Sequence, residues 1–256
     1  MSKIAGQDSN LPSVLNPRSP LTIHHSLSVL FFLAICINPV YLSSMHYISH
    51  LSKDKKFKKL LATATPYTLK KRKNICNYLC ASIMSQQLST KVATMIHNRF
   101  LALYGGKEPT PQQILNTPFD TLRAIGLSNA KTNYVKNVAQ FETEFGMDHK
   151  KLNKMDNEEV IAYLTPIKGV GRWTVEMLLM FALGREDVFA IDDLGIQNAM
   201  IKLYKLDNSD KKKLKEELLR ISAKWSPYRT YACKHLWNWK DNTPVKQEKP
   251  GKKKTK

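Results

Sequence analysis

The sequence has few cysteines: four among 256 residues, with no CxxC pair. Structural zinc sites and iron–sulfur clusters need several thiolates or imidazoles at close spacing, and no His/Cys cluster is present. Cys76 and Cys80 lie four residues apart on an apolar helical pattern, which favours buried thiols over metal ligands. We therefore expect no iron–sulfur cluster and no required cofactor, and a reducing compartment fits.

Long apolar runs are also missing. The longest, from Leu27 to Ile37, is about half the length that spans a membrane, and Asn38-Pro39 follows at once. It is short enough for a signal-peptide core, but no compact Lys/Arg cluster precedes it and no convincing small-residue cleavage site follows. The interpretation we favour makes residues 1–44 an upstream extension before a start at Met45. No stable membrane association is expected.

Acidic residues are scarce beside basic ones. The chain has 40 Lys and Arg against 21 Asp and Glu, a formal net charge of +19. Such an excess indicates a polyanionic partner, nucleic acid first and an anionic membrane surface second, although solubility alone is an alternative. Part of the excess lies in residues 241–256, which end in KQEKPGKKKTK and are typical of a disordered basic tail.

Strand-like alternation is absent from residue 45 onward, and helix start and stop signals recur instead. Short polar residues precede the apolar stretches as expected N-caps, at Ser89, Thr110, Ser128, Asp156 and Ser209. The pattern predicts about ten helices joined by short loops, in an all-α domain over residues 45–240.

One turn between two expected helices carries two glycines. In LTPIKGVGRWTVEML, Gly169 and Gly171 bracket Val170, and glycine permits positive φ and close approach of a ligand. The amides at the start of the second helix point outward beside the positive end of its dipole, which suits a phosphate oxygen. Lys168 and Arg172 add charge. The alternative is an ordinary helix–helix turn.

Two aspartates stand before the next expected helix, LGIQNAMIKLYKL. Asp192 is well placed as its N-cap, which puts Asp193 in the first turn, where the helix dipole favours an anion.

Four blocks in this order resemble one family: SIMSQQLS, IKGVGRWT, AIDDLGI and KWSPYRTYACKHLW. They resemble the helix-hairpin-helix DNA glycosylases, in the branch of 3-methyladenine glycosylase II, which removes alkylated bases. The resemblance covers about residues 45–240. It implies two helical lobes with a central cleft, in the compact form without an N-terminal β domain.

The resemblance also implies site roles. In the family the catalytic aspartate is followed by two variable residues and then an apolar one. In this chain that pattern is met by Asp193, with Leu194 and Gly195 as the variable residues and Ile196 as the apolar one. Relatives that also cut the strand use a lysine at the position of Trp173 to form a Schiff base, so tryptophan there implies base removal alone. The implied base pocket consists of Trp173, Trp237, Leu194 and Met177. For either tryptophan, core packing is the alternative.

The remaining implied contacts are with DNA and a cation. Gln87 matches the residue that fills the hole left by a flipped base, with its neighbour Leu88 as a second candidate that could instead pack inward. The implied DNA-binding set is Gln87, Leu88, Lys168, Gly169, Val170, Gly171, Arg172 and Thr174. Backbone carbonyls of Thr165, Ile167 and Gly169 are implied ligands of a monovalent cation such as Na⁺ or K⁺.

These observations predict a monofunctional glycosylase acting on double-stranded DNA that contains alkylated bases. We expect a monomer in the cytoplasm, associated with the nucleoid. Arg229 is expected near the cleft, paired with Asp192 or holding a phosphate. A non-catalytic helix-hairpin-helix DNA-binding protein and a membrane-associated protein built around residues 27–42 remain the alternatives.

Overall fold

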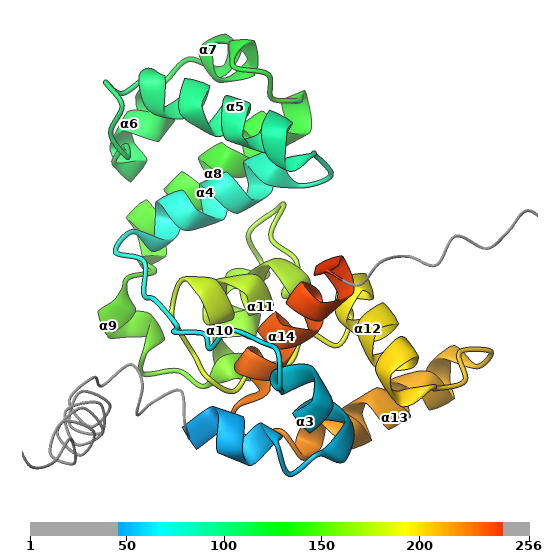
Figure 1. Cartoon of the computed structure of the whole chain (residues 1–256). Helices are drawn as coiled ribbons and strands as arrows, with labels where there is room; N and C mark the ends of the chain where they lie inside the picture. The colour runs from blue at the N-terminus through cyan, green and yellow to red at the C-terminus, as the bar shows by residue number, and fades with distance from the viewer. Residues whose placement is uncertain (1–45, 243–256) are drawn as a thin grey trace, which may run out of the picture. The chain divides into compact units, whose positions relative to one another are not determined.

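The computed structural model describes residues 46–242, and their regular structure is helical throughout, with no strand (Figure 1). A helical stretch over residues 46–51 precedes the labelled helices. These are α3 (Lys55–Leu61), α4 (Ile75–Ser85), α5 (Thr90–Ala102), α6 (Pro111–Asn116), α7 (Phe119–Ala124), α8 (Asn129–Phe145), α9 (His149–Leu152), α10 (Asn157–Leu164), α11 (Arg172–Phe181), α12 (Leu194–Tyr204), α13 (Lys211–Ala223) and α14 (Arg229–Asn242). The all-α prediction is confirmed.

The expected boundaries are only partly open to comparison. The proposed extension over residues 1–44 and the tail beyond Asn242 lie outside the described residues. Asp241 and Asn242, which we expected in the tail, belong to α14 instead. Across residues 46–242, no helix is long and apolar enough to cross a membrane.

The described helices form two lobes. In the first, α4 packs on α5 and α8, and α8 also packs on α6 and α7. In the second, α10 packs on α11, α12 on α14, and α14 on α3. The helix α11 also contacts α4, so the two lobes meet there (Figure 1). The predicted two-lobed arrangement is therefore present.

Each lobe has its own buried apolar residues. Leu79 and Ile83 of α4 meet the face of α8 that carries Val135 and Val138, and none of the four is exposed. In the second lobe Trp225 is 1% exposed, with the rings of Phe57, Phe189 and Tyr204 around it. Burial of such large side chains supplies most of the stabilisation of a fold of this kind.

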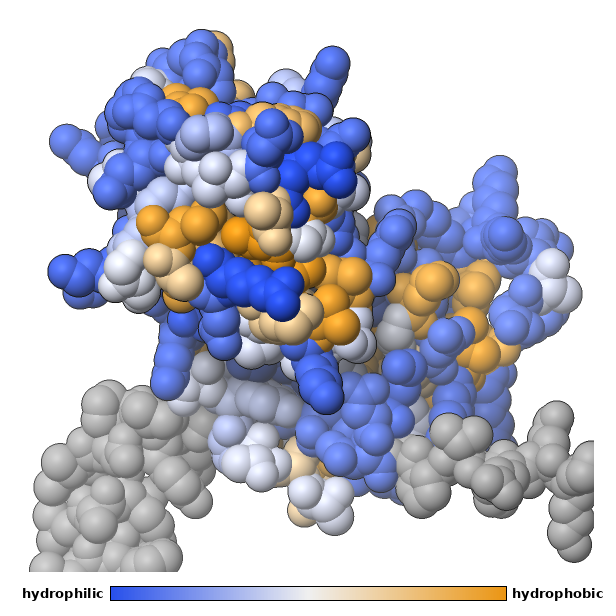
Figure 2. Space-filling view, turned by 90° about the horizontal axis from the view of Figure 1, so that it is seen from above, coloured by the Kyte–Doolittle hydropathy of each residue, from blue (hydrophilic) through white to orange (hydrophobic). Residues whose placement is uncertain are grey.

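The first lobe has a mixed surface. Seen from above in Figure 2, hydrophilic residues cover most of it and apolar patches lie between them. The exposed large apolar side chains on α5 or directly beside it are Leu88, Val92, Met95 and Leu103.

The N-caps test the expected starts of the helices. The side chains of Ser89, Thr110, Ser128 and Asp156 each accept the predicted backbone N–H bond. Ser209 does not: Asp210 caps α13 through the amides of Lys212 and Lys213. Ser209 instead donates its hydroxyl hydrogen to Asp207. Serine and aspartate cap helices about equally well, so the sequence did not distinguish these two neighbours.

Candidate active site

The glycine-bearing turn joins α10 to α11. Gly169 has φ of 97°, and a Cβ at this residue would lie 2.4 Å from Cγ of Tyr134. No other residue fits there without displacing that ring. Gly171 differs from expectation, because its φ of −97° is ordinary and open space surrounds the position of a Cβ. The turn itself therefore does not need a glycine at this position.

The N-terminus of α11 has no side-chain cap. Among the described residues, the amides of Arg172 and Trp173 have no hydrogen-bond partner, so they remain available to an anion. Two members of the implied DNA-binding set are buried: Val170 and Thr174 are each 4% exposed. Thr174 can therefore offer only its backbone amide to DNA.

The two cations of the turn are in different situations. Lys168 is exposed. Arg172 is held by two carboxylates, because one terminal nitrogen lies 2.8 Å from Glu158 and Nε lies 3.1 Å from Glu176. The Arg172 guanidinium lowers the pKa of Glu158 through its hydrogen bonds. Arg172 therefore adds its charge to the turn as part of ion pairs with Glu158 and Glu176, and its predicted contact with DNA stays a prediction.

Glu176 itself is buried, with 2% of its surface exposed, and its Oε2 atom has no partner among the described residues. Burial raises the pKa of this carboxyl to about 7, against the opposing effect of Arg172. The first turns of α11 therefore combine free amides on the outside with a buried acid on the inside.

A strained turn follows α4 and faces the hairpin. Gln87 has φ of 57°, in the left-handed region that side chains larger than glycine rarely adopt, and its side chain is exposed. The turn is held by Lys131, which donates to the carbonyls of Met84 (3.0 Å) and Gln86 (2.6 Å). Nε2 of Gln86 also donates to the carbonyl of Gly169 at 3.3 Å.

This strain presents Gln87 to solvent, which fits the predicted insertion into DNA, a role that stays a prediction. Leu88 is 37% exposed, so it does not pack inward as the alternative held.

Asp193 is the best-anchored carboxylate near the turn. Its Oδ1 accepts from the amide of Ile196 at 2.8 Å and from Nε1 of Trp237 at 2.9 Å. Its Oδ2 accepts from Nε1 of Trp173, also at 2.9 Å. Three N–H donors from three helices therefore fix both oxygens. The sequence alone did not reveal that the two indoles act as donors here.

The capping assignment of the two aspartates was wrong. Asp193, and not Asp192, is the N-cap of α12. Asp192 is exposed and its Oδ1 lies 3.0 Å from Nζ of Lys215. The error arose because either aspartate precedes the apolar run by a suitable distance, and only the backbone decides which one turns into the helix.

Gly195 makes room for this arrangement. A Cβ on Gly195 would lie 3.0 Å from Oδ1 of Asp193 and 3.1 Å from Cδ1 of Trp237. These distances are shorter than ordinary van der Waals contacts, so any larger residue would press on the carboxylate and on the indole that holds it. The glycine at position 195 therefore has a physical reason in this chain.

A cleft of about 820 Å³ lies between α4 and α5 on one side and α11 on the other. Trp173, Met177 and Phe181 of α11 form its apolar wall, with Tyr78 of α4. Trp173 is 42% exposed, so it reaches into the cleft while its N–H holds Asp193. The predicted central cleft is thus present, with the candidate catalytic carboxylate bonded to its wall.

Two residues of the implied base pocket do not line this cleft. Leu194 is 71% exposed, and Trp237 packs on Phe181 with ring centroids 5.8 Å apart. Sequence reasoning missed Tyr78 and Phe181, because both lie in apolar helical patterns that are typical of core. The polar lining that it also missed consists of Lys71, Arg72, Lys73, Asn74, Asn77, Ser82, Ser85, Thr94, His97 and Glu108.

Arg229 does not pair with Asp192. Its Nε lies 2.6 Å from Oδ1 of Asp187, and NH2 lies 2.9 Å from the other oxygen. Although burial opposes it, hydrogen bonds from Arg229 and Ser226 lower the pKa of Asp187. This fork-like pair fixes the start of α14, the helix that carries Trp237.

The three carbonyls implied as cation ligands lie in the turn. The carbonyl of Ile167 accepts from the amide of Val170 at 2.9 Å, and that of Gly169 accepts from Gln86. A carbonyl oxygen has a second lone pair, so these bonds leave room for a cation. Within residues 46–242, no group of three or more His, Cys, Asp and Glu is placed to hold a metal ion.

Comparison with known proteins agrees with this geometry. Residues 80–224 match the family model described as "HhH-GPD superfamily base excision DNA repair protein". The chain belongs to this superfamily. The chain is 38% identical, over 186 residues, to DNA-3-methyladenine glycosylase 1 of Schizosaccharomyces pombe, covering 72% of this chain and 80% of that protein.

Solved structures of 3-methyladenine DNA glycosylases share the fold of this chain. The 3-methyladenine DNA glycosylase of Schizosaccharomyces pombe in complex with abasic DNA superposes with a TM-score of 0.67 at 35% identity. That match covers 77% of this chain and 97% of the other. A DNA-3-methyladenine glycosidase from Bacillus halodurans gives a TM-score of 0.66 at 34% identity, covering 75% and 88% of the two chains.

Proposed function

We propose that the protein is a monofunctional DNA glycosylase that hydrolyses the N-glycosidic bond of alkylated purines of the 3-methyladenine type. The observation that carries this function is the Asp193 carboxylate, held by Trp173, Trp237 and the Ile196 amide at the wall of an aromatic cleft. Membership of the superfamily supports DNA as the partner, and the names of the relatives support alkylated purines as the substrate.

The carboxylate supplies what the bond cleavage needs. As the base leaves, positive charge develops on the sugar, as it does in glycoside hydrolysis. A fixed anion stabilises that charge, and the same carboxylate orients or deprotonates the attacking water. The three N–H donors hold the Asp193 carboxylate in one orientation, so the carboxylate needs little reorganisation during the reaction. An alkylated purine is already cationic and leaves readily, so a strong general acid is dispensable.

The cleft and the turns position the DNA. We assign the hairpin amides and Lys168 to a backbone phosphate, and Gln87 to the space that the flipped base leaves. The flipped base enters the cleft beside Met177 and against Trp173, Phe181 and Tyr78, whose electron-rich rings favour a cationic base. At the position where a Schiff-base lysine would stand, Trp173 has no amine, so no strand cleavage follows.

The oligomeric state, the location in the cell and a bound cation are also part of the proposal, and they rest on the family resemblance. We expect a monomer in the cytoplasm, associated with the nucleoid. The turn carbonyls of Thr165, Ile167 and Gly169 are the proposed ligands of a monovalent cation, which would add positive charge beside the bound phosphate.

The test is base release from duplexes that each carry one lesion: 3-methyladenine, 7-methylguanine, ethenoadenine or hypoxanthine. We expect release of an alkylated base, with an abasic site that breaks only on later treatment with alkali. A protein that binds these duplexes but releases no base would establish the non-catalytic alternative. Strand breaks without alkali would contradict the monofunctional assignment.

A further inference from the structure

A second cavity, of about 420 Å³, lies between α3 and α13, and we call it the α3–α13 cavity. It shares no lining residue with the cleft of the candidate active site. In Figure 1, α3 and α13 lie at the end of their lobe away from α4 and α5. The cavity is therefore outside the site assigned to the flipped base.

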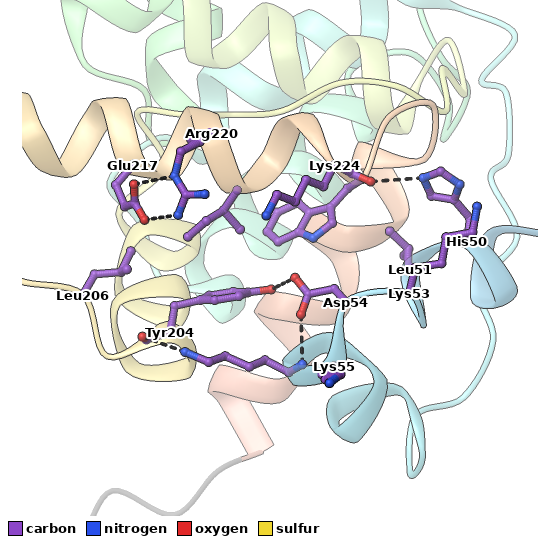
Figure 3. A pocket seen from close by; sticks show the side chains of 13 residues that line it. His50, Leu51, Lys53, Asp54, Lys55, Tyr204, Leu206, Glu217, Arg220 and Lys224 are labelled. Carbon is purple, nitrogen blue, oxygen red and sulfur yellow. Dashed lines mark hydrogen bonds and ion pairs between the residues drawn. The ribbon is translucent and has the colours of Figure 1, made fainter.

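The lining of this cavity is strongly basic. Its cations are Lys53, Lys55, Lys56, Arg220 and Lys224, with His50 beside them, and its only acids are Asp54 and Glu217. Figure 3 shows His50, Lys53 and Lys55 on one side, and Arg220 and Lys224 of the α13 segment on the other.

Both acids already have partners within the protein. Asp54 accepts the Tyr204 hydroxyl at 2.6 Å and caps α3 through the amides of Lys56 and Phe57. Glu217 pairs with Arg220. Neither carboxylate therefore needs the remaining cations of the cavity.

Lys56 donates to the carbonyl of Tyr204 at 2.9 Å, and His50 contacts the carbonyl of Lys224 at 3.2 Å, so these two cap helix ends. Lys53, Lys55 and Lys224 are exposed, and among the described residues no hydrogen bond or ion pair holds their side chains, although the charge of Lys224 lowers the pKa of Glu217. The charges of these three lysines give the cavity a positive potential that attracts anions.

Trp225 forms the buried wall of the cavity. It is 1% exposed, and its indole N–H lies at the Tyr204 hydroxyl. That hydroxyl donates its own hydrogen to Asp54 and keeps lone pairs that accept from the indole. Trp225 therefore has a partner inside the protein, and its indole reports on what binds in the adjoining cavity.

We propose that the α3–α13 cavity binds a phosphate group. A ligand that contacts three ammonium groups at once must carry negative charge and several acceptor oxygens, and phosphate has both. The Lys56 ammonium lies over the ring of Tyr204, 5.1 Å from its centroid. This ring is therefore occupied and does not offer a nucleobase a surface for stacking. A free phosphate ester and a phosphate of a second DNA segment share this chemistry.

The indole N–H signals of the four tryptophans report the binding directly in a ¹H–¹⁵N spectrum of the full chain. Trp173→Phe, Trp237→Phe and Trp239→Phe assign three signals, and the fourth is that of Trp225. We expect inorganic phosphate, added at constant ionic strength, to shift the Trp225 signal in a saturable way and to leave that of Trp239 in place.

Two matched variants test the lysines. Replacing Lys53, Lys55 and Lys224 together with glutamine should weaken phosphate binding about tenfold or more, since the charge-assisted contacts of all three ammonium groups are lost together. Replacing Lys107, Lys150 and Lys154 removes the same charge elsewhere on the surface and should leave binding unchanged. Equal weakening in both variants would show a diffuse ionic atmosphere and overturn the site.

An undamaged duplex is the second titrant. If the duplex shifts the Trp225 signal and inorganic phosphate does not, the ligand is a DNA phosphate; a shift with inorganic phosphate establishes the free phosphate. If neither moves the signal, the proposal is wrong. None of these outcomes depends on base release, so the site fails or stands separately from the glycosylase function.

Discussion

Two helices of the same lobe begin in opposite ways. The helix α11 starts after Gly171 with no side-chain cap, and its free amides face outward. The helix α12 starts after Asp193, whose carboxylate caps it. The first N-terminus is left open for an anion that comes from outside, while the second holds an anion of its own. In the proposed reaction one grips the phosphate and the other faces the positive charge that develops on the sugar.

The two helix starts are also connected. Trp173, the second residue of α11, donates its N–H to the cap of α12. A phosphate on the amides of α11 and a base against the Trp173 ring would therefore be positioned relative to Asp193 by one short segment. The comparison predicts that changes at the two N-termini have different readouts: binding for α11 and reaction rate for α12.

The largest effect is expected at the cap of α12. Asp193→Asn should lower the single-turnover rate of base release by about 10²–10³-fold, because the charge that stabilises the cationic sugar is gone. Asparagine also caps helices well, so the fold should survive, as circular dichroism would confirm. Binding to lesion DNA should be kept or strengthened, since an anion beside a polyanion is removed. A variant with unchanged release would refute the assigned role.

The second effect concerns the stability of α11. Glu176 has a pKa raised to about 7 by burial, against 4.5 for the ordinary carboxyl. The folded state therefore binds this proton more tightly than the unfolded chain. Glu176 therefore contributes fully to the free energy of unfolding below pH 4.5, and this contribution is lost as pH rises through 7. The loss amounts to up to about 3 kcal/mol.

Glu176→Gln mimics the protonated form and should remove this part of the pH dependence. Urea unfolding at pH 5 and pH 8 measures it, with the exposed Glu216→Gln as the control. An unchanged dependence in Glu176→Gln would mean that another group causes it.

Much of the fold was predictable because it depends on local signals. Caps such as Ser128 and Asp156, and the turn glycine Gly169, act on neighbours within a few residues, and the sequence shows those neighbours directly. Errors occurred where two adjacent residues could do the same work, as with Ser209 and Asp210 or with Asp192 and Asp193. Distinguishing such neighbours needs the backbone direction at one residue.

The sequence allowed us to predict which residues belong to the candidate site, but it did not allow us to predict the hydrogen bonds between them. The family frame identified Asp193, Trp173 and Trp237, but their hydrogen bonds join residues 20 and 44 positions apart in the chain. Such pairings depend on how α11, α12 and α14 pack. The same limit explains why the ion pair between Arg172 and Glu158 was not foreseen: Glu158 is 14 residues away on another helix.

The third effect tests the indole donors. Trp237→Phe keeps a ring against Phe181 and removes the N–H that holds Oδ1 of Asp193. We expect kcat to fall about tenfold, because a lost hydrogen bond to a charged group costs about 1.5–3 kcal/mol, with little change in KM. Trp239→Phe is the same change on the same helix and should leave kcat intact. A rise in KM alone would make Trp237 a base-stacking residue and not a positioning one.

A smaller effect is expected at the open N-terminus of α11. Lys168→Ala should flatten the salt dependence of binding to undamaged duplex by about one unit of log–log slope, because one phosphate contact releases one counterion. Arg172→Ala should leave that slope unchanged and lower the free energy of unfolding, since it leaves the buried Glu176 without its partner. If Arg172→Ala flattens the slope as much as Lys168→Ala, the ion pairs open on DNA and the assignment of the grip is wrong.

The smallest effect is expected at Asp192, next to the catalytic candidate. Its carboxylate is exposed and pairs with Lys215 on the surface, an interaction worth between 0 and about 1 kcal/mol. Asp192→Asn leaves the three donors of Asp193 in place, so the rate of base release should stay within about twofold of the unchanged protein. Single-turnover release, measured beside Asp193→Asn in the same buffer, makes the comparison direct. A large loss at Asp192 with a small one at Asp193 would reverse the two roles: the capping carboxylate would then serve only the helix, and the exposed one would face the sugar.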